Sequence, residues 1–299
     1  MENTLWDAVI IGGGAAGLSA GVVLARARFA TLVVDAGEPR NGPAGHMHGY
    51  LTRDGMAPKE FLATGRDEFT RYGGTVERAA VAAARRDPDG TFEIRLGDDR
   101  VLRARSVLVA TGLTDELPDI PGLAERWASE VHHCPHCHGY EVRGRAVVVI
   151  GSAHLAALMR RHSPSVTFCP HGTEVGPAER HRLTAYGVRV VDARVTRVSD
   201  GLTLDLDDGG TLTCDAIFVQ SRPVPHDAVL NALGARRDPG SGLVDVDRQG
   251  ATDVPGLWAA GNVVNPRAQV VAAAGAGGTA AIAMSSWLLE RELAGGAAR

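Results

Sequence analysis

The chain has few cysteines, no excess of basic residues and no pattern typical of a signal peptide at its beginning. Each of these shortages argues against one class of protein. Four cysteines among 299 residues are too few for the disulfide framework of a secreted scaffold. A formal charge of −4 provides no basic surface for nucleic acid or anionic lipid. No basic and apolar signal segment precedes Trp6, so we expect a cytoplasmic protein. The length allows two domains of ordinary size.

One uncharged stretch, from Ala268 to Leu289, is long enough to suggest a membrane span. It consists mostly of Ala and Gly, with Gln269, Thr279 and two serines interspersed. This composition favours a close-packed internal helix. We therefore expect neither a membrane nor a nucleic-acid partner.

The beginning of the chain carries a dinucleotide-binding pattern. An apolar run over 8–11 indicates a buried parallel strand, and it continues into Gly12-Gly13-Gly14-Ala15-Ala16-Gly17 and a helix-forming segment. In the pattern G-x-G-x-x-G, Gly12 makes the tight turn, Gly14 lets the backbone approach a pyrophosphate, and Gly17 allows close helix packing. A second strand over 31–34 ends at Asp35, near the offset expected for a ribose-binding carboxylate.

A redox-dithiol spacing lies in the middle of the chain, where residues 132–141 are HHCPHCHGYE. Cys134 and Cys137 can close a disulfide, and nearby cationic imidazoles can hold one sulfur as thiolate at neutral pH. Zinc is the alternative, because Cys-x-x-Cys is half of many structural zinc sites. A second ligand pair at finger spacing is missing from the sequence, so we predict a redox dithiol and no metal.

Two later segments point to the kind of dinucleotide. A strand pattern ends at Ala110-Thr111-Gly112, and another ends at Gly261-Asn262. With the glycine-rich turn, these resemble the three FAD-contact segments of flavoprotein disulfide reductases that have two dinucleotide-binding domains. In that family the residue after the last glycine is usually Asp, whereas Asn262 brings no charge. Ala268, Gln269 and Val270 resemble the family's segment that runs under the flavin ring. The resemblance implies FAD as the cofactor.

A second strand-and-turn pattern covers residues 146–151, which in low-molecular-weight thioredoxin reductases is the NADPH site. Here Ala153 occupies the second glycine position and places a methyl group where the pyrophosphate should approach the backbone. Glu174 follows the next strand, near the place where the reductases carry arginines. We therefore expect NADPH to be a poor reductant.

From Trp6 to Leu289 the order of these segments resembles thioredoxin reductase. The resemblance implies an α/β fold with two Rossmann-like dinucleotide-binding domains of three-layer ββα type, and a homodimer. It also implies a discontinuous FAD-binding domain, formed by residues 1–115 and 238–299. Residues 116–237 would then form a central, NADPH-like domain that carries the two cysteines.

The motif Cys-x-x-Cys-His-Gly-Tyr-Glu, together with Arg40-Asn41, resembles FAD-dependent dithiol oxidases that close disulfides in natural products such as gliotoxin and holomycin. Those enzymes return flavin electrons to O2 and release H2O2. The resemblance implies that Cys134 exchanges with a small-molecule dithiol and that Cys137 passes electrons to FAD. His138 is the candidate acid/base, because an imidazole can take a thiol proton, with His132, His133 and His136 as alternatives.

Two other functions are compatible with the sequence. One is a disulfide reductase that draws electrons from NADPH or another donor. The other is a non-catalytic protein that binds flavin or zinc. Reduction of the flavin by NADPH would separate the reductase from the oxidase, and metal analysis would identify the zinc protein.

Overall fold

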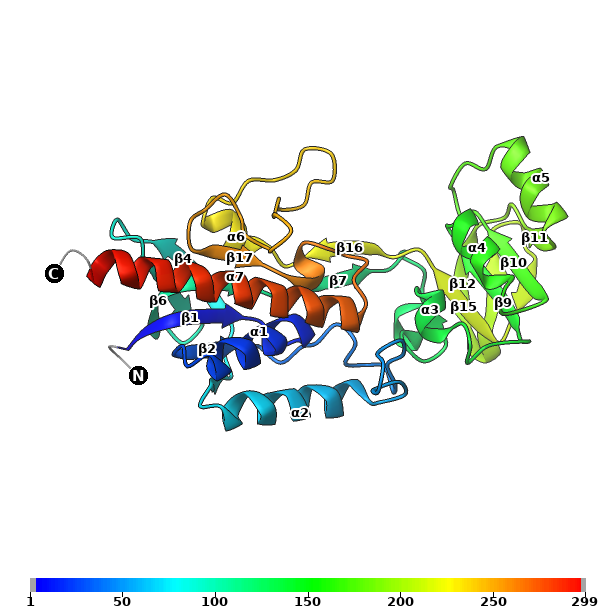
Figure 1. Cartoon of the computed structure of the whole chain (residues 1–299). Helices are drawn as coiled ribbons and strands as arrows, with labels where there is room; N and C mark the ends of the chain where they lie inside the picture. Colours follow the sequence, from blue (N-terminus) through cyan, green and yellow to red (C-terminus); the bar gives the residue numbers. More distant parts are fainter. Residues whose placement is uncertain (1–3, 297–299) are drawn as a thin grey trace. The chain divides into compact units, whose positions relative to one another are not determined.

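The computed structural model describes residues 4–296, which form two units (Figure 1). The first unit contains the chain up to Thr114 and again from Val224 onward, and the second contains residues 115–223. The two connecting strands, β7 (Leu113–Glu116) and β16 (Arg222–Pro225), pair with each other.

The first unit is built on a seven-stranded sheet in the order β3-β2-β1-β6-β5-β4, with β17 also paired to β6. Strands β3, β2, β1, β6 and β17 are parallel neighbours, whereas β4, β5 and the first part of β6 are antiparallel. The strands are β1 (Leu5–Ile11), β2 (Thr31–Val34), β3 (Thr75–Glu77), β4 (Val81–Arg86), β5 (Phe92–Leu96), β6 (Val101–Val109) and β17 (Leu257–Ala259).

Strand β1 is buried on both faces, which explains its continuous apolar sequence. Ala8 and Ile10 pack in a cluster with residues of the helices, whereas Val9 and Ile11 pack in a cluster with β4, β5 and α6. The unit therefore has three layers: helices, parallel strands and antiparallel strands. Its helices are α1 (Ala15–Arg26), α2 (Pro58–Arg71), α6 (Ala228–Ala232), the 3-10 turn η3 (Gly261–Val263) and α7 (Val270–Gly296).

Helix α7 is the one described helix that is long and apolar enough to cross a membrane. Its small residues pack against α1: a Cβ on Gly277 would clash with the carbonyl of Ala16. Ala280, Met284 and Leu288 on the same helix are also buried. One face of α7 therefore belongs to the core of the first unit, as the small-residue composition predicts.

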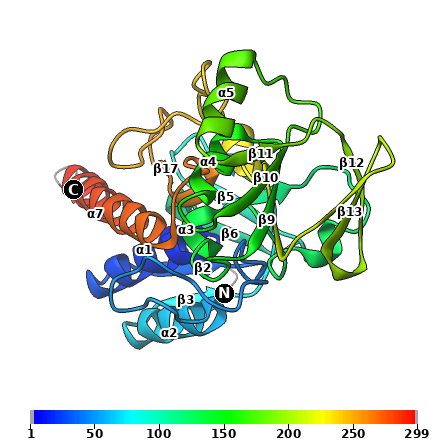
Figure 2. The same cartoon turned by 90° about the vertical axis from the view of Figure 1, so that its right-hand side faces the viewer.

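The second unit contains a five-stranded parallel sheet in the order β11-β10-β9-β15-β8 and an antiparallel sheet β12-β13-β14 (Figure 2). One face of the parallel sheet is covered by α4 and α5, and the other packs on the antiparallel sheet. The strands are β8 (Val131–His132), β9 (Ala146–Ile150), β10 (Ser165–Cys169), β11 (Val188–Val190), β12 (Val195–Ser199), β13 (Thr203–Leu206), β14 (Thr211–Thr213) and β15 (Ala216–Val219). The helices are η1 (Ala124–Arg126), α3 (Pro135–His138), α4 (Ala153–Met159), α5 (Pro177–Ala185) and η2 (Asp200–Leu202).

The two units give the fold class expected from the sequence, α/β with two Rossmann-like domains. One boundary differs, because residues 224–237 lie in the first unit and not in the central one. The physical reason is packing. Leu230 and Leu233 of the α6 segment are buried in the same hydrophobic cluster as Val9 and Val107.

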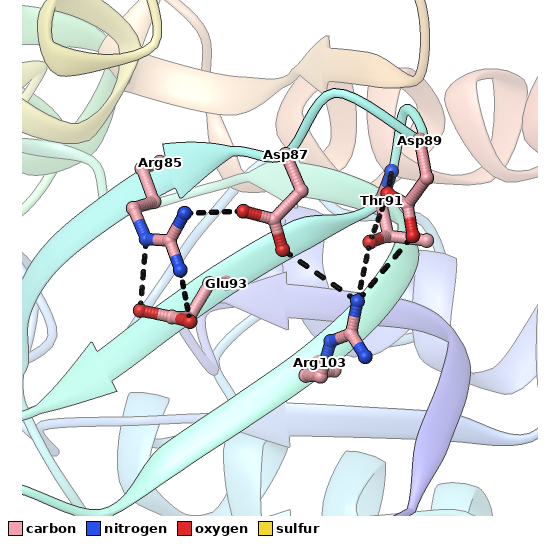
Figure 3. Close-up of polar contacts among 6 residues, drawn as sticks. All are labelled: Arg85, Asp87, Asp89, Thr91, Glu93 and Arg103. Atoms are coloured by element: carbon pink, nitrogen blue, oxygen red, sulfur yellow. Dashed lines mark hydrogen bonds and ion pairs between the residues drawn. The ribbon is translucent and has the colours of Figure 1, made fainter.

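The outer strands of the first unit are joined by ion pairs (Figure 3). Arg85 on β4 donates two hydrogen bonds to Glu93 on β5, at 3.0 and 2.5 Å, and also pairs with Asp87. Arg103 on β6 lies 3.5 Å from Asp87 and 3.4 Å from Asp89. The arginines are more than half exposed, so each pair contributes little stability.

Candidate active site

The carboxyl ends of four parallel strands meet at one edge of the first unit. Strands β1, β2, β6 and β17 end just before Gly12, Asp35, Ala110 and Gly261 respectively. Ligands of open α/β sheets bind outside this edge. The structure therefore brings together four segments that the sequence had singled out separately.

The glycine-rich turn depends on two close backbone approaches. Gly12 has a φ of +109°, and a Cβ there would clash with the carbonyl oxygen of Ala110. A Cβ on Gly17 would clash with the carbonyl oxygen of Gly12. The roles predicted for these glycines, a tight turn and close helix packing, agree with this geometry.

The space over the beginning of α1 is open. A Cβ on Gly14, the N-cap residue, would have nothing within 4 Å. Ala15 and Ala16 form the first helical positions, and no acidic residue lies in the first turn. Unpaired N–H groups and the positive end of the helix dipole thus face an unobstructed approach, which suits a pyrophosphate.

The side chain of Asp35, which follows β2, is held by two backbone N–H groups. Its Oδ1 accepts hydrogen bonds from the backbone N–H of Gly13 at 3.2 Å and of Gly37 at 3.1 Å. A Cβ on Gly13 would lie 2.6 Å from Cγ of Asp35, so this position also requires glycine. Sequence reasoning missed that role, although the three consecutive glycines were the available signal.

The segment after β6 is held by a histidine that sequence reasoning did not identify. The hydroxyl of Thr111 donates to the carbonyl of His226 at 2.7 Å, and Nδ1 of His226 lies 3.1 Å from the carbonyl oxygen of Thr111. The backbone N–H of His226 donates to Gly112 at 3.0 Å. His226 is 115 residues from Thr111, and no local pattern could have indicated this contact.

Asn262 organises the loop that leads into α7. Its amide Nδ2 donates to the carbonyl oxygens of Asn265 and Ala268 at 3.0 Å, and to that of Pro266 at 3.4 Å. Arg40 donates to the same Pro266 carbonyl at 3.2 Å. The side chain that replaces the family's usual Asp thus acts as a hydrogen-bond donor to three carbonyls.

The remaining predicted cofactor residues lie beside this loop or near Arg40. Gly261 has a φ of +80°, and a Cβ there would lie 3.0 Å from the Cβ of Ala16. Asn41 follows Arg40, and its carbonyl accepts a hydrogen bond from Ala44 at 3.1 Å. Gln269 precedes Val270, the first residue of α7.

Cys134 and Cys137 form a disulfide in the second unit, with their Cα atoms 5.3 Å apart. Cys134 is the N-cap residue of α3, and Pro135 occupies the first helical position, where a missing N–H costs nothing. Helix α3 ends at His138 and is capped by Gly139, where a Cβ would lie 2.7 Å from Nε2 of His162. Cys134 is 8% exposed, and Cys137 is half-buried.

The histidines around the disulfide have different environments. His138 stacks on His132, with ring centroids 4.3 Å apart and an interplanar angle of 16°. His133 stacks on Trp127 at 5.3 Å, whereas His136 is exposed. Burial, followed by the charges of His138 and His133, lowers the pKa of His132 to about 4. At neutral pH His132 is therefore uncharged.

The second glycine turn lies between β9 and α4. Gly151 has a φ of +84°, and Ser152 caps α4 by accepting a hydrogen bond from Leu155 at 3.2 Å. Ala153, at the position where the pattern has its second glycine, is the first residue of α4. The hydroxyl of Thr173 donates to the carbonyl of Gly151 at 3.3 Å, which ties the following loop to the turn.

Two arginines of this unit have defined positions. Arg160, at the far end of α4, donates to the carbonyls of Ser163 and Tyr186, so its guanidinium is engaged away from the Gly151 turn. Arg194 packs against Gly172, just after β10. Sequence reasoning missed Arg194, because it reaches this loop from a distant part of the chain.

Comparison with known proteins identifies the family. The model of the pyridine nucleotide-disulphide oxidoreductases matches residues 6–278. The chain belongs to this family. Among curated relatives, thioredoxin reductase tcpT of Claviceps purpurea is 31% identical over 87% of both chains. Thioredoxin reductase aclD of Aspergillus oryzae is 35% identical over 71% of this chain and 73% of its own.

A solved structure extends the likeness to nearly every described residue. The crystal structure of HlmI superposes with a TM-score of 0.94 at 43% identity, over 98% of this chain and 95% of the HlmI chain. The chain, as a member of the pyridine nucleotide-disulphide oxidoreductases, is thus a thioredoxin reductase-like oxidoreductase. Within residues 4–296, no group of three or more His, Cys, Asp or Glu side chains is arranged to hold a metal ion.

Proposed function

We propose that the protein is an FAD-dependent oxidase that closes an intramolecular disulfide in a small-molecule dithiol. The observation that carries this proposal is the Cys134–Cys137 disulfide, which is flanked by stacked histidines in a thioredoxin reductase-like fold. In this proposal O2 takes the electrons and H2O2 is released. We propose the cytoplasm as its location, on the basis of its thioredoxin reductase-like fold.

The cysteines carry the exchange steps. A substrate thiolate attacks Cys134, forming a mixed disulfide and releasing Cys137 as thiolate. The second substrate thiol then displaces Cys134, so the substrate leaves as a disulfide and the enzyme retains two thiols. His138 accepts the proton of a substrate thiol and supports thiolate formation. Two electrons have then moved from the substrate to the enzyme pair.

FAD fits the first unit. The open approach at Gly14, the fixed carboxylate of Asp35 and the loop held by Asn262 lie at one strand edge. When bound there, FAD supplies the two-electron chemistry that links the enzyme dithiol to O2. Ala110, Thr111, Gly112 and the segment Ala268-Gln269-Val270 are the further residues that would hold it.

The alternative function is a disulfide reductase fed by NADPH. Ala153 at the second glycine turn argues against it, because a methyl group there opposes close approach of a pyrophosphate. Arg194 beside Gly172 is the observation in its favour, because it places a cation near the loop where a 2′-phosphate would lie.

The test uses the purified, flavin-loaded chain. Under anaerobic conditions a dithiol such as reduced holomycin or dithiothreitol should bleach the flavin, and admission of O2 should restore its colour with one H2O2 formed for each disulfide. NADPH should leave the absorbance unchanged over the same time. Stoichiometric bleaching by NADPH within seconds would establish the reductase instead. A colourless protein that takes up no added FAD would refute both functions.

We also propose that the enzyme is a homodimer joined through α7. The outward face of this helix exposes Val271, Ile282, Leu289 and Leu293, with 42%, 62%, 49% and 59% of each residue accessible. No charged residue interrupts the helix before Glu290. Between Val271 and Leu289 a second copy would cover this face without burying a charge. Light scattering should give twice the chain mass, and Ile282→Glu should give the monomer; a monomeric parent protein would refute the proposal.

A further inference from the structure

His132 occupies an unusual place for a polar side chain. It is 6% exposed and lies on β8, where its backbone is in register with Phe218 of β15. The centroid of its ring lies 5.4 Å from that of the Phe218 ring and 4.3 Å from that of the His138 ring. Its Nδ1 is buried and has no hydrogen-bond partner among the described residues.

This position is costly for a histidine. A buried polar atom without a partner is destabilising, whereas an apolar ring of similar shape would avoid that penalty. Burial also holds the pKa of His132 well below its ordinary value, at about 4, so the ring carries no charge at neutral pH. His132 therefore contacts the His138 ring with a flat, neutral aromatic face.

We propose that His132 is a positioning residue, and that its ring is the platform on which His138 stacks. The stack fixes the plane of the His138 ring, and hence the direction of its nitrogens, next to Cys137. This inference rests on the proposed function, in which His138 moves the thiol proton. His132 itself transfers no proton in this scheme.

The neutrality of the platform matters for His138. A protonated imidazole is stabilised over a neutral aromatic face, whereas a second cationic ring at 4.3 Å would repel it. A neutral His132 therefore does not oppose a positive charge on the neighbouring ring. The other titratable groups near the stack are His133, which follows β8, His162 beside Gly139, and the two cysteines; Tyr140, Glu141 and Arg143 follow α3 in the chain.

Two variants of His132 distinguish the contribution of its aromatic ring from that of its nitrogen atoms. His132→Phe keeps a flat ring between Phe218 and His138 and removes the unpartnered Nδ1. His132→Ala removes the platform. The matched control is His181→Ala, an exposed histidine on α5 of the same unit. Melting temperatures come first, and we expect the Phe variant to be at least as stable as the parent protein.

The readout is the rate at which dithiothreitol reduces Cys134–Cys137, measured anaerobically across pH in the flavin-loaded full chain by trapping the free thiols. This exchange requires no O2, so it can succeed even where oxidase turnover fails. We expect His132→Ala to be slower by about tenfold or more, because a misplaced acid/base loses much of its effect. His132→Phe and His181→Ala should retain the parent rate and pH profile.

A double-mutant cycle decides whether His132 acts through His138. If it does, His132→Ala should slow exchange no further once His138 is alanine. An additive loss would overturn the proposal, as would a Phe variant as slow as the Ala variant or an Ala variant with the parent rate. If His138→Ala alone exchanged at the parent rate, the proton-transfer role assigned under the proposed function would fail as well, and that result is distinct from the others.

Discussion

Restoring the family's usual acid at position 262 should harm this protein. The Asn262→Asp substitution removes the amide that donates to the carbonyls of Asn265, Pro266 and Ala268. It also directs a carboxylate toward three carbonyl oxygens. The loop that these bonds hold leads directly into α7, so the damage should reach the proposed flavin site as well as the fold.

The magnitude follows from the contacts. Two bonds of 3.0 Å and one of 3.4 Å are lost, at about 0.5–1.5 kcal/mol each, less whatever water recovers at this half-buried position. We expect a loss of about 2 kcal/mol, or about 4–8 °C in melting temperature for a unit of this size.

The loss should depend on pH. The nearby carbonyls disfavour the charged form, and a protonated carboxyl can donate, so the folded pKa of the new group is raised above its unfolded value of about 3.9. A raised folded pKa gives stability that is present below the unfolded pKa and lost as pH rises through the folded one. The deficit relative to the parent protein should therefore be smallest near pH 4 and complete at neutral pH.

The assay is thermal unfolding across pH, together with the fraction of FAD retained after gel filtration. The control is Asn265→Asp, the same change at an exposed position of the same loop. An Asn262→Asp protein that melts and retains FAD as the parent does at pH 7 would show that Asn262 does not hold the loop.

Three further predictions concern other parts of the molecule. Cys134→Ser and Cys137→Ser should both abolish dithiol oxidation. When the substrate is offered in its disulfide form, the Cys134 thiolate of Cys137→Ser should attack it, release one substrate thiol and form a mixed disulfide visible by mass spectrometry; a mixed disulfide found only in Cys134→Ser would reverse the assigned roles. Burial raises the pKa of Cys169 to about 11 and that of Cys214 to about 12, so iodoacetamide at pH 8 should modify neither thiol before denaturation. Labelling of the native protein would contradict that burial. Arg103→Ala should cost less than about 1 kcal/mol in denaturant unfolding, because its ion pairs are exposed; a larger loss would mean that the network acts cooperatively.

The sequence predicted the strand edge of the first unit because its signals are local. A buried strand, a glycine turn and a helix lie next to one another in the chain, so Gly12, Gly14 and Gly17 could be assigned roles from spacing alone. Asp35 could be placed for the same reason, since it ends the next strand. The meeting of these segments at one edge then follows from the parallel sheet.

The features that the sequence did not predict depend on contacts between residues far apart in the chain. His226 forms hydrogen bonds with the Thr111 segment, 115 positions away. Arg194, just before β12, packs against Gly172, which follows β10. The same limit explains the misplaced boundary. The proline-rich stretch near 223 and the Pro-Gly turn near 239 are equally good breaks in the sequence, and only the burial of Leu230 and Leu233 assigns the segment between them to the first unit.

The histidines show why residue type and spacing cannot assign roles within a cluster. Along the chain, His132 is as close to Cys134 as His136 is, yet His132 is buried and uncharged while His136 is exposed. A buried neutral imidazole is a weak base at neutral pH and a good aromatic surface. The candidate base, His138, is half-buried, as His133 is, and it stacks on His132, six positions away in sequence, with the ring centroids 4.3 Å apart.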